Sequence, residues 1–190
     1  MILPIRAYGD PVLRKKAKDI SKDYPELDVL IDNMFETMYG ANGIGLAAPQ
    51  IGLDIRLFVV DVSPLSEDED YEDIADDLKD FKKVFINARI LEESGEEWKF
   101  NEGCLSIPEV REDVKRKSTI KIEYYDRNFV KHTDTFSDIR ARVIQHEYDH
   151  IEGILFTDHL SALKKKIVKG KLQKIANGEV AVSYKMRFPK

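Results

Sequence analysis

Apolar positions at helical spacing mark the clearest element in the first part of the chain. Between residues 27 and 38 they fall three and four positions apart, which places them on one face of a helix. They are Leu27, Leu30, Ile31, Met34, Phe35 and Met38. Pro25 lies near the start of this pattern, and glycines at 40 and 43 follow its end. The pattern therefore predicts a core helix over residues 27–38.

Continuous apolar and β-branched runs predict the strands. Two such runs are IRLFVVDV at 55–62 and KVFINARI at 83–90. The stretches STIKIEYYD and FVKHTDTF alternate between apolar and polar residues around Asp126-Arg127-Asn128, which is typical of a β-hairpin. VAVSY at 180–184 predicts a short closing strand.

Two more helices are predicted in the second half of the chain. The first begins at Ser137, which is placed as an N-cap, and ends at Gly153. Its apolar face directs His146 and His150 inward. The second is strongly basic and covers about 163–176. Strands precede the first of these helices without βαβ alternation, so we predict an α+β fold. Small antiparallel or mixed sheets would pack around the central histidine-bearing helix, followed by a C-terminal helix.

Composition is consistent with one globular domain over residues 1–190. Hydrophobic residues make up 43% of the chain and charged residues 34%, which is enough apolar material to form a core. No apolar run approaches the ~20 residues that cross a bilayer, and the start of the chain does not resemble a signal peptide. A single cysteine excludes an internal disulfide. We therefore expect a cytoplasmic protein without a membrane partner.

The net charge of −5 conceals two opposite segments. Residues 66–80 hold nine acidic residues and one lysine, and residues 163–190 hold nine basic residues and one acid. We interpret the acidic insertion as a solvated, mobile loop. The basic end has two interpretations of equal weight. It is either a solvated helix face or a surface that binds the phosphate groups of RNA.

The stretch HEYDH at 146–150 has the H-E-x-x-H spacing of hydrolytic metal sites. On a helix, His146 and His150 lie on one face, so both imidazoles can reach one ion. Glu147 lies ~100° around the helix from His146 and can reach a water molecule without binding the ion. Two partly buried histidines on an amphipathic helix would give the same spacing by chance.

The third ligand does not follow the pattern of the metzincin proteases, which would place a histidine where this chain has Phe156. The carboxylates downstream are Glu152, Asp158 and Glu179, and none is well placed. Upstream, NEGCLSIP contains the lone Cys104. A thiolate and two imidazoles form a good tetrahedral set with one open position. The alternative is that this cysteine is a small buried hydrophobic residue.

Three motifs in order resemble those of peptide deformylases: GIGLAAPQ at 43–50, EGCLS at 102–106 and QHEYDH at 145–150. The resemblance covers nearly the whole chain. It implies removal of the N-formyl group from the initiator methionine of nascent polypeptides. It also implies that Cys104, His146 and His150 hold one divalent ion, with Fe2+ the usual choice and Zn2+, Ni2+ or Co2+ as possible occupants.

The resemblance also implies roles for residues around the ion. Glu147 would accept a proton from water and pass it to the departing amine. The Gln50 side-chain amide and the Leu105 backbone N–H would stabilise the negative charge on the formyl oxygen. A structural amide that bonds to its own loop is the other interpretation of Gln50.

The methionine side chain of the substrate needs an apolar slot. By resemblance, the slot and its opening would involve Ile44, Gly45, Ile139 and Val143, with the glycine allowing the peptide backbone to approach. Glu102 and Asp149 are candidates to orient the two imidazoles. Each could instead form an ordinary buried ion pair, for instance with Arg116.

Two other classes of protein remain as alternatives. A zinc metalloprotease or aminopeptidase would need a third ligand downstream of the H-E-x-x-H stretch. A structural zinc site in an RNA-binding module would need a fourth protein ligand. His132 and His159 are the only other histidines, and neither has ligand-like spacing. The structural site would also leave Glu147 without a role.

Overall fold

The computed structural model describes residues 1–189. Lys190, the last residue of the predicted domain and of the basic end, lies outside the described part. The fold contains an antiparallel sheet of five strands in the order β2-β3-β4-β5-β6. Its strands are β2 (Gly45–Ala47), β3 (Leu57–Asp61), β4 (Lys82–Cys104), β5 (Ile107–Tyr125) and β6 (Lys131–Ser137). The predicted hairpin around residues 126–128 is the β5–β6 connection.

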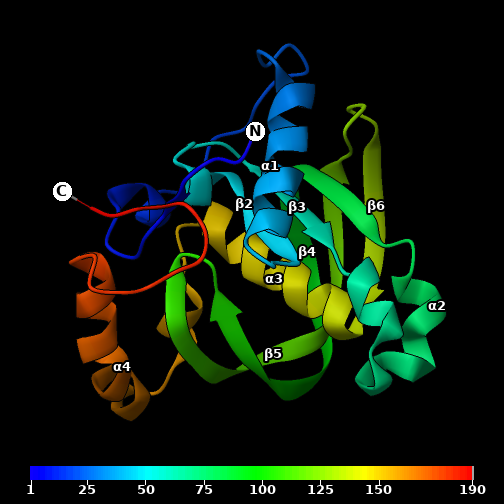
Figure 1. Ribbon diagram of the computed structural model, residues 1–190. Helices are drawn as coiled ribbons and strands as arrows, with labels where there is room; N and C mark the ends of the chain where they lie inside the picture. The colour runs from blue at the N-terminus through cyan, green and yellow to red at the C-terminus, as the bar shows by residue number, and fades with distance from the viewer. Residues whose placement is uncertain (190) are drawn as a thin grey trace.

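The β4–β5 hairpin is much longer than the sequence patterns indicated. Its register shifts at four places, between Ile86 and Arg89, Ile90 and Glu92, Ser94 and Glu97, and Gly103 and Cys104. Such irregularities bend a strand and increase its twist. The hairpin curves below α3 in Figure 1. It carries the end of β4, with Cys104, back toward the central helix.

Residues 1–189 also contain four α-helices: α1 (Leu27–Gly40), α2 (Ala75–Leu78), α3 (Asp138–Ile151) and α4 (Ala162–Ala176). Short 3-10 helices connect them: η1 (Pro11–Arg14), η2 (Ala48–Ile51), η3 (Ser63–Glu67), η4 (Glu69–Ile74) and η5 (Phe156–His159). The predicted α+β class is confirmed, as are the helices expected near 27–38 and 163–176. None of the helices in residues 1–189 is both long enough and apolar enough to cross a membrane.

Helix α3 lies at the centre of the molecule (Figure 1) and packs against β2, β3, β5 and β6. Its buried apolar face joins a core that includes the stacked rings of Phe58 and Phe85, with centroids 4.8 Å apart. Ser137 precedes the helix at the N-cap position, as predicted, but its hydroxyl does not cap it. The hydroxyl instead lies 3.0 Å from Thr119 Oγ1 on the neighbouring strand.

A second, two-stranded sheet joins distant parts of the chain. Strand β1 (Ile5–Arg6) pairs in parallel with β7 (Met186–Arg187). The prediction of a strand at 180–184 is wrong, because these residues form no strand and pairing begins only at Met186. The run VAVSY has β propensity, but no neighbouring strand lies beside it.

The acidic insertion is also more ordered than predicted. Residues 63–78 form η3, η4 and α2 rather than an irregular loop. Leu78 is fully buried, and Leu65, Tyr71 and Ile74 pack against the core. These apolar side chains hold the segment on the protein while its carboxylates face solvent.

Candidate metal centre and catalytic site

The third ligand suggested by the sequence lies beside the two histidines. Cys104 ends β4, and His146 and His150 are one turn apart on α3. The Sγ atom and the imidazole nitrogens of these three residues all lie within 4.8 Å of one another. Cys104 Sγ is 3.3 Å from His150 Nε2. One sulfur and two nitrogens at this separation suit a tetrahedral ion with an open fourth position.

The electrostatics of the two imidazoles also favour a cation. Burial lowers the pKa of His150 to about 3, so this ring is neutral and available as a ligand at neutral pH. Burial would also lower the pKa of His146, but hydrogen bonds with Cys104 and Glu102 raise it well above 6.5. Positive charge is therefore stabilised at this position, and these donors fit a divalent metal ion.

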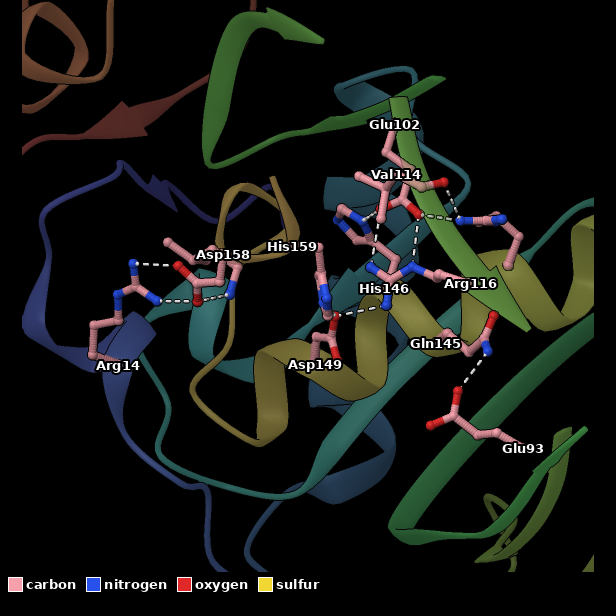
Figure 2. A network of polar contacts seen from close by, with 12 residues as sticks. Arg14, Glu93, Glu102, Val114, Arg116, Gln145, His146, Asp149, Asp158 and His159 are labelled. Atoms are coloured by element: carbon pink, nitrogen blue, oxygen red, sulfur yellow. Dashed lines mark hydrogen bonds and ion pairs between the residues drawn. The ribbon is translucent and has the colours of Figure 1, made fainter. Parts of the chain in front are cut away.

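The buried carboxylate of Glu102 contacts both the first imidazole and Arg116, the partner considered for an ordinary ion pair. It accepts hydrogen bonds from Arg116 Nε at 2.7 Å and Nη2 at 3.0 Å, and from Arg142 Nη1 at 3.0 Å. Its Oε2 is also 3.0 Å from His146 Nδ1. Burial raises the pKa of Glu102, but these bonds outweigh that effect and hold the pKa well below 4.5. Figure 2 shows the carboxylate between the histidine and the arginine.

Asp149 does not orient either ligand by a hydrogen bond. Its Oδ2 accepts from Arg116 Nη1 at 2.8 Å and lies 2.8 Å from His159 Nε2 (Figure 2). The ion-pair alternative with Arg116 is therefore the observed one. His150 Nδ1 is buried and has no hydrogen-bond partner within residues 1–189. Asp149 and Glu102 thus share Arg116, but only Glu102 reaches a ligand.

Glu147 lies on α3 between the two histidines, with only 4% of its surface exposed. Within residues 1–189 its Oε2 has no hydrogen-bond partner. Burial raises its pKa to about 7. A carboxylate with this pKa can both accept and return a proton near neutral pH.

Gln50 makes the loop contact of the structural interpretation and also directs its amide nitrogen toward Cys104. Its Oε1 accepts a hydrogen bond from the Ala47 N–H at 2.9 Å, which ties the side chain to its own loop. Its Nε2 points the other way, 3.6 Å from Cys104 Sγ and 3.2 Å from Ser106 Oγ. The loop contact fixes the amide so that its Nε2 faces Cys104 and Ser106.

Leu105 follows Cys104 in the turn between β4 and β5. Its carbonyl accepts a hydrogen bond from the Tyr184 hydroxyl at 2.7 Å. Within residues 1–189 its backbone N–H donates no hydrogen bond. The N–H is therefore available to an oxygen atom bound near Cys104.

A cavity of about 830 Å³ opens in front of these groups. Of the predicted slot residues, Ile44, Gly45 and Val143 line it. Ile139 does not line the cavity. It is 1% exposed and packs in the core beneath α3, one turn before Val143. The apolar face of α3 is wide enough to serve both the core and the cavity, and sequence spacing did not separate the two.

Two contributors to the site were not anticipated. Arg142 is buried on α3 and donates to Glu102, to the Val114 carbonyl at 3.0 Å and to the Trp98 carbonyl at 2.7 Å. Its position one turn before His146 was the only sequence signal for it. Residues 181–184 line the cavity from the C-terminal part of the chain. No motif marked them.

The fold and this arrangement define a hydrolase that depends on a metal ion. A sequence model described as "Polypeptide deformylase" matches residues 2–166. Peptide deformylase of Christiangramia forsetii is 64% identical over 190 residues, covering 100% of this chain and 97% of the relative. Peptide deformylase of Flavobacterium johnsoniae is 60% identical over 189 residues, covering 99% and 96%.

Solved structures give the same result. The peptide deformylase from Legionella pneumophila superposes with a TM-score of 0.79 at 37% identity, covering 94% of this chain and 98% of that one. The one from Thermotoga maritima gives 0.73 at 38% identity, covering 85% and 99%. The chain belongs to the peptide deformylase family. It is an enzyme that removes the N-formyl group from nascent polypeptides, as the sequence motifs implied.

Proposed function

We propose that Cys104, His146 and His150 hold the metal ion on which this deformylase depends. The observation that carries the proposal is the convergence of one sulfur and two imidazole nitrogens within 4.8 Å, from strand β4 and helix α3. A divalent ion, when bound there, supplies Lewis-acid polarisation of a carbonyl group and of water. Glu102 orients one of these ligands without binding the ion, because its carboxylate fixes the His146 ring through Nδ1.

Glu147 is the proton carrier in this proposal. Its carboxylate accepts a proton from the attacking water and donates it to the amine that leaves when formate departs. Burial supports this role, because it raises the pKa of Glu147 to about 7. Its unpartnered Oε2 is free to bond the water.

Gln50 and Leu105 stabilise the formyl oxygen as negative charge develops on it. The Gln50 Nε2 is held toward Cys104 by the bond between its Oε1 and the Ala47 N–H. The Leu105 N–H has no competing acceptor within residues 1–189. Donors that are fixed before the reaction need no reorganisation in the transition state, and one such donor is typically worth about 100- to 1,000-fold in rate.

The methionine side chain of the substrate lies against Ile44 and Val143 in this proposal. Both line the cavity beside Glu147, as does Gly45, which has no side chain to hinder the peptide backbone. Ile139 supports Val143 from the core and does not touch substrate. The substrate is thus a peptide whose formylated residue is buried and whose remaining residues leave through the cavity mouth.

For the ion we propose Fe2+, with Zn2+, Ni2+ and Co2+ able to occupy the same ligands. A set of one sulfur and two nitrogens accepts all of these ions, and the family resemblance favours iron. The test is purification without oxygen, followed by metal analysis and an assay of formate release from formyl-Met-Ala-Ser. Iron at about one per chain with high activity supports the proposal. Full activity with zinc alone contradicts the choice of iron.

We also propose that the enzyme works in the cytoplasm, on chains that emerge from the ribosome, and that α4 contacts the ribosome. Lysines at 165, 166, 169 and 174 are exposed on this helix. Leu163 and Ile167 are also exposed, at 69% and 65%. Lys164 differs, because it pairs with Glu112 at 2.8 Å. Basic side chains around an apolar patch suit a surface of RNA and protein.

Charge reversal on α4 tests this contact. The variant carries Lys165→Glu, Lys166→Glu and Lys169→Glu, and the control carries Lys99→Glu, Lys115→Glu and Lys117→Glu on the exposed β4–β5 hairpin. Both triple variants change the net charge equally. We expect only the α4 variant to lose co-sedimentation with ribosomes in low salt. Equal retention of both variants contradicts the contact. Truncation is less suitable, because Val168, Leu172 and Ile175 of α4 are buried.

The chain as a whole, residues 1–190, acts as a single catalytic domain in this proposal. The β1–β7 pairing and the contact between Tyr184 and Leu105 support it, because they join the C-terminal part to the site and to the N-terminal strand.

A further inference from the structure

The C-terminal strap, residues 180–188, returns from α4 toward the start of the chain. The chain reverses after α4 at Gly178, which adopts φ of 78° and donates its N–H to the Ile175 carbonyl at 3.0 Å. The far end of the strap is fixed to β1. The Ile5 N–H donates to the Lys185 carbonyl, and the Ala7 N–H donates to the Arg187 carbonyl, both at 2.9 Å. Figure 1 shows this red segment passing between α4 and the N-terminal region.

The middle of the strap is tied to the catalytic turn. The Tyr184 hydroxyl donates to the Leu105 carbonyl at 2.7 Å. Next to this bond, the Tyr8 N–H donates to the Ser106 carbonyl at 2.8 Å. Burial raises the pKa of Tyr184 to about 12, so its hydroxyl keeps the proton that it donates at neutral pH. The strap therefore has a defined position relative to Cys104 and the turn that follows it.

Residues 181–184 lie at the mouth of the catalytic cavity. They line the same space as Glu147 and Gln50. Those two side chains are 4% and 1% exposed, whereas Ala181 and Ser183 are exposed to solvent. A peptide with its formylated end beside Glu147 must leave through this mouth. The strap forms one wall of this exit.

The strap presents unpaired backbone groups at this place. Within residues 1–189, no hydrogen bond reaches a backbone N–H or carbonyl of residues 180–184. Pairing resumes at Lys185 and continues through β7. Residues 180–182 have no regular structure and Ser183 and Tyr184 form a bend, so these backbone groups are not committed to a sheet. Free backbone donors and acceptors of this kind can pair with the backbone of a bound peptide. The unpaired segment coincides with the part of the strap that lines the cavity.

We infer that residues 180–184 bind the backbone of the substrate residues that follow the formylmethionine, and that Tyr184 positions this segment through Leu105. The inference rests on the proposed function, because it needs formyl peptides to bind in this cavity. Backbone pairing of this kind extends recognition along the peptide without requiring a particular side chain.

Peptide length tests the inference directly in the unaltered holoenzyme. The substrates are formyl-Met-Ala and its extensions by one, two and three alanines. We expect kcat/KM to rise about three- to tenfold once the peptide reaches the strap, the range given by one or two additional hydrogen bonds. The rise should come mainly from a lower KM, because these contacts are equal in the ground state and the transition state.

The longest peptide is then N-methylated at one backbone amide at a time, at each residue after the second. This series identifies which substrate N–H groups bond to the strap. We expect methylation of an amide that pairs with the strap to return kcat/KM to the value of the short peptide. If no single methylation lowers kcat/KM, backbone pairing through a substrate N–H is excluded.

Two strap variants form a matched pair. Val182→Pro removes the backbone N–H of this strap residue. Val182→Ala shortens the side chain but keeps the backbone N–H. We expect the ratio of kcat/KM for the longest and shortest peptides to fall toward one only in the proline variant. Tyr184→Phe keeps the ring but loses the bond to Leu105, so the same ratio should fall there as well. A ratio unchanged in both Val182→Pro and Tyr184→Phe overturns the inference.

The outcomes distinguish peptide binding by residues 180–184 from deformylation itself. Equal kcat/KM for all peptide lengths in the unaltered enzyme overturns the role of the strap and leaves deformylation intact. Failure to release formate from any of the peptides overturns the proposed function and the inference together. If Val182→Pro does not fold, which thermal unfolding would show, the ratio of kcat/KM for the longest and shortest peptides in Tyr184→Phe decides the matter.

Discussion

Gly45 and Glu147 meet so closely that no side chain fits between them. A Cβ atom on Gly45 would lie 2.8 Å from both Cγ and Cδ of Glu147. The glycine belongs to β2 and the glutamate to α3, so their contact sets the distance between the sheet edge and the catalytic helix. The second glycine of the GIGLAAPQ motif therefore has a steric cause in addition to any approach of substrate.

Gly45→Ala should displace the Glu147 carboxylate. Misplacing a catalytic group by about 1 Å costs on the order of 100-fold in rate, and we expect kcat to fall by about that factor. Metal content should remain unchanged, because neither residue is a proposed ligand. The measurement is kcat with formyl-Met-Ala-Ser, together with metal analysis.

Gly170→Ala is the matched control. An added Cβ at Gly170 meets nothing within 4 Å, and the residue lies inside α4. Helix propensity predicts stabilisation by ~1 kcal/mol with unchanged kcat. If Gly45→Ala keeps full activity, the contact with Glu147 does not constrain catalysis.

Glu147→Gln should leave the metal bound and remove nearly all turnover. The amide is close in shape to the carboxylate, but it cannot accept a proton from water. We expect kcat to fall by at least about 100-fold, the lower end for loss of a general acid–base group. Metal analysis and formate release measured on the same preparation check both statements. Substantial activity at neutral pH would end the assignment of Glu147 as the proton carrier.

Glu102→Gln should weaken both the fold and the metal site. The carboxylate neutralises two buried guanidinium groups, those of Arg116 and Arg142. Removing one partner from a buried ion pair typically costs ~3–5 kcal/mol, because the remaining charge is left uncompensated. We also expect metal affinity to fall about 10- to 100-fold, since His146 loses its acceptor.

Chemical unfolding and metal titration of the Glu102→Gln variant measure these two effects separately. Asp149→Asn is a suitable comparison, because Asp149 also pairs with Arg116 but reaches neither ligand by a hydrogen bond. It should lose stability with a smaller loss of metal affinity. Equal metal affinity in the parent and the Glu102→Gln variant would contradict the orienting role.

Asp158→Asn should lower stability at neutral pH but not in strong acid. Asp158 accepts two hydrogen bonds from Arg14, at 2.6 and 3.1 Å, which join η5 to η1 (Figure 2). Partial burial raises the pKa of Asp158, but the bond from Arg14 outweighs this and lowers the pKa below 3.8. The stabilisation is therefore complete above the unfolded-state pKa and disappears as pH falls through the lower folded-state value.

Both side chains are more than a third exposed, at 45% and 38%, so solvent screens the pair. We expect a difference of up to ~1 kcal/mol at pH 7. Urea unfolding of the parent and variant at pH 7 and below pH 3 measures it. A difference that persists unchanged in acid would show that the ion pair is not its source.

Local spacing explains why much of the site was predictable. His146, Glu147 and His150 lie on one helix, whose geometry fixes their relative directions from the sequence alone. Cys104 was a candidate third ligand on chemical grounds, because it is the lone cysteine and a thiolate suits two imidazoles in a tetrahedral set. The long-range neighbours could not be read in this way. Glu102 meets Arg142 only because a bent hairpin returns to α3, and no sequence period encodes that return.

The two errors in the fold have a common physical cause. A segment of β-branched residues becomes a strand only where a partner lies beside it, and residues 180–184 have none within the described chain. An acidic segment becomes ordered where a few apolar side chains anchor it, as Leu78 does for α2. In both cases the presence or absence of tertiary contacts determined the structure, and local composition did not.

The pairing of β1 with β7 has a consequence for the order in which the enzyme matures. Contacts between segments far apart in sequence form late, because the intervening chain must first be closed into a loop. During synthesis, the five-stranded sheet and α3 can assemble while β7 is still inside the ribosomal tunnel. At that stage Leu105 has not met Tyr184, and one wall of the cavity does not exist. A newly made molecule therefore passes through a stage at which Cys104, His146 and His150 can already converge while residues 180–184 do not yet line the cavity.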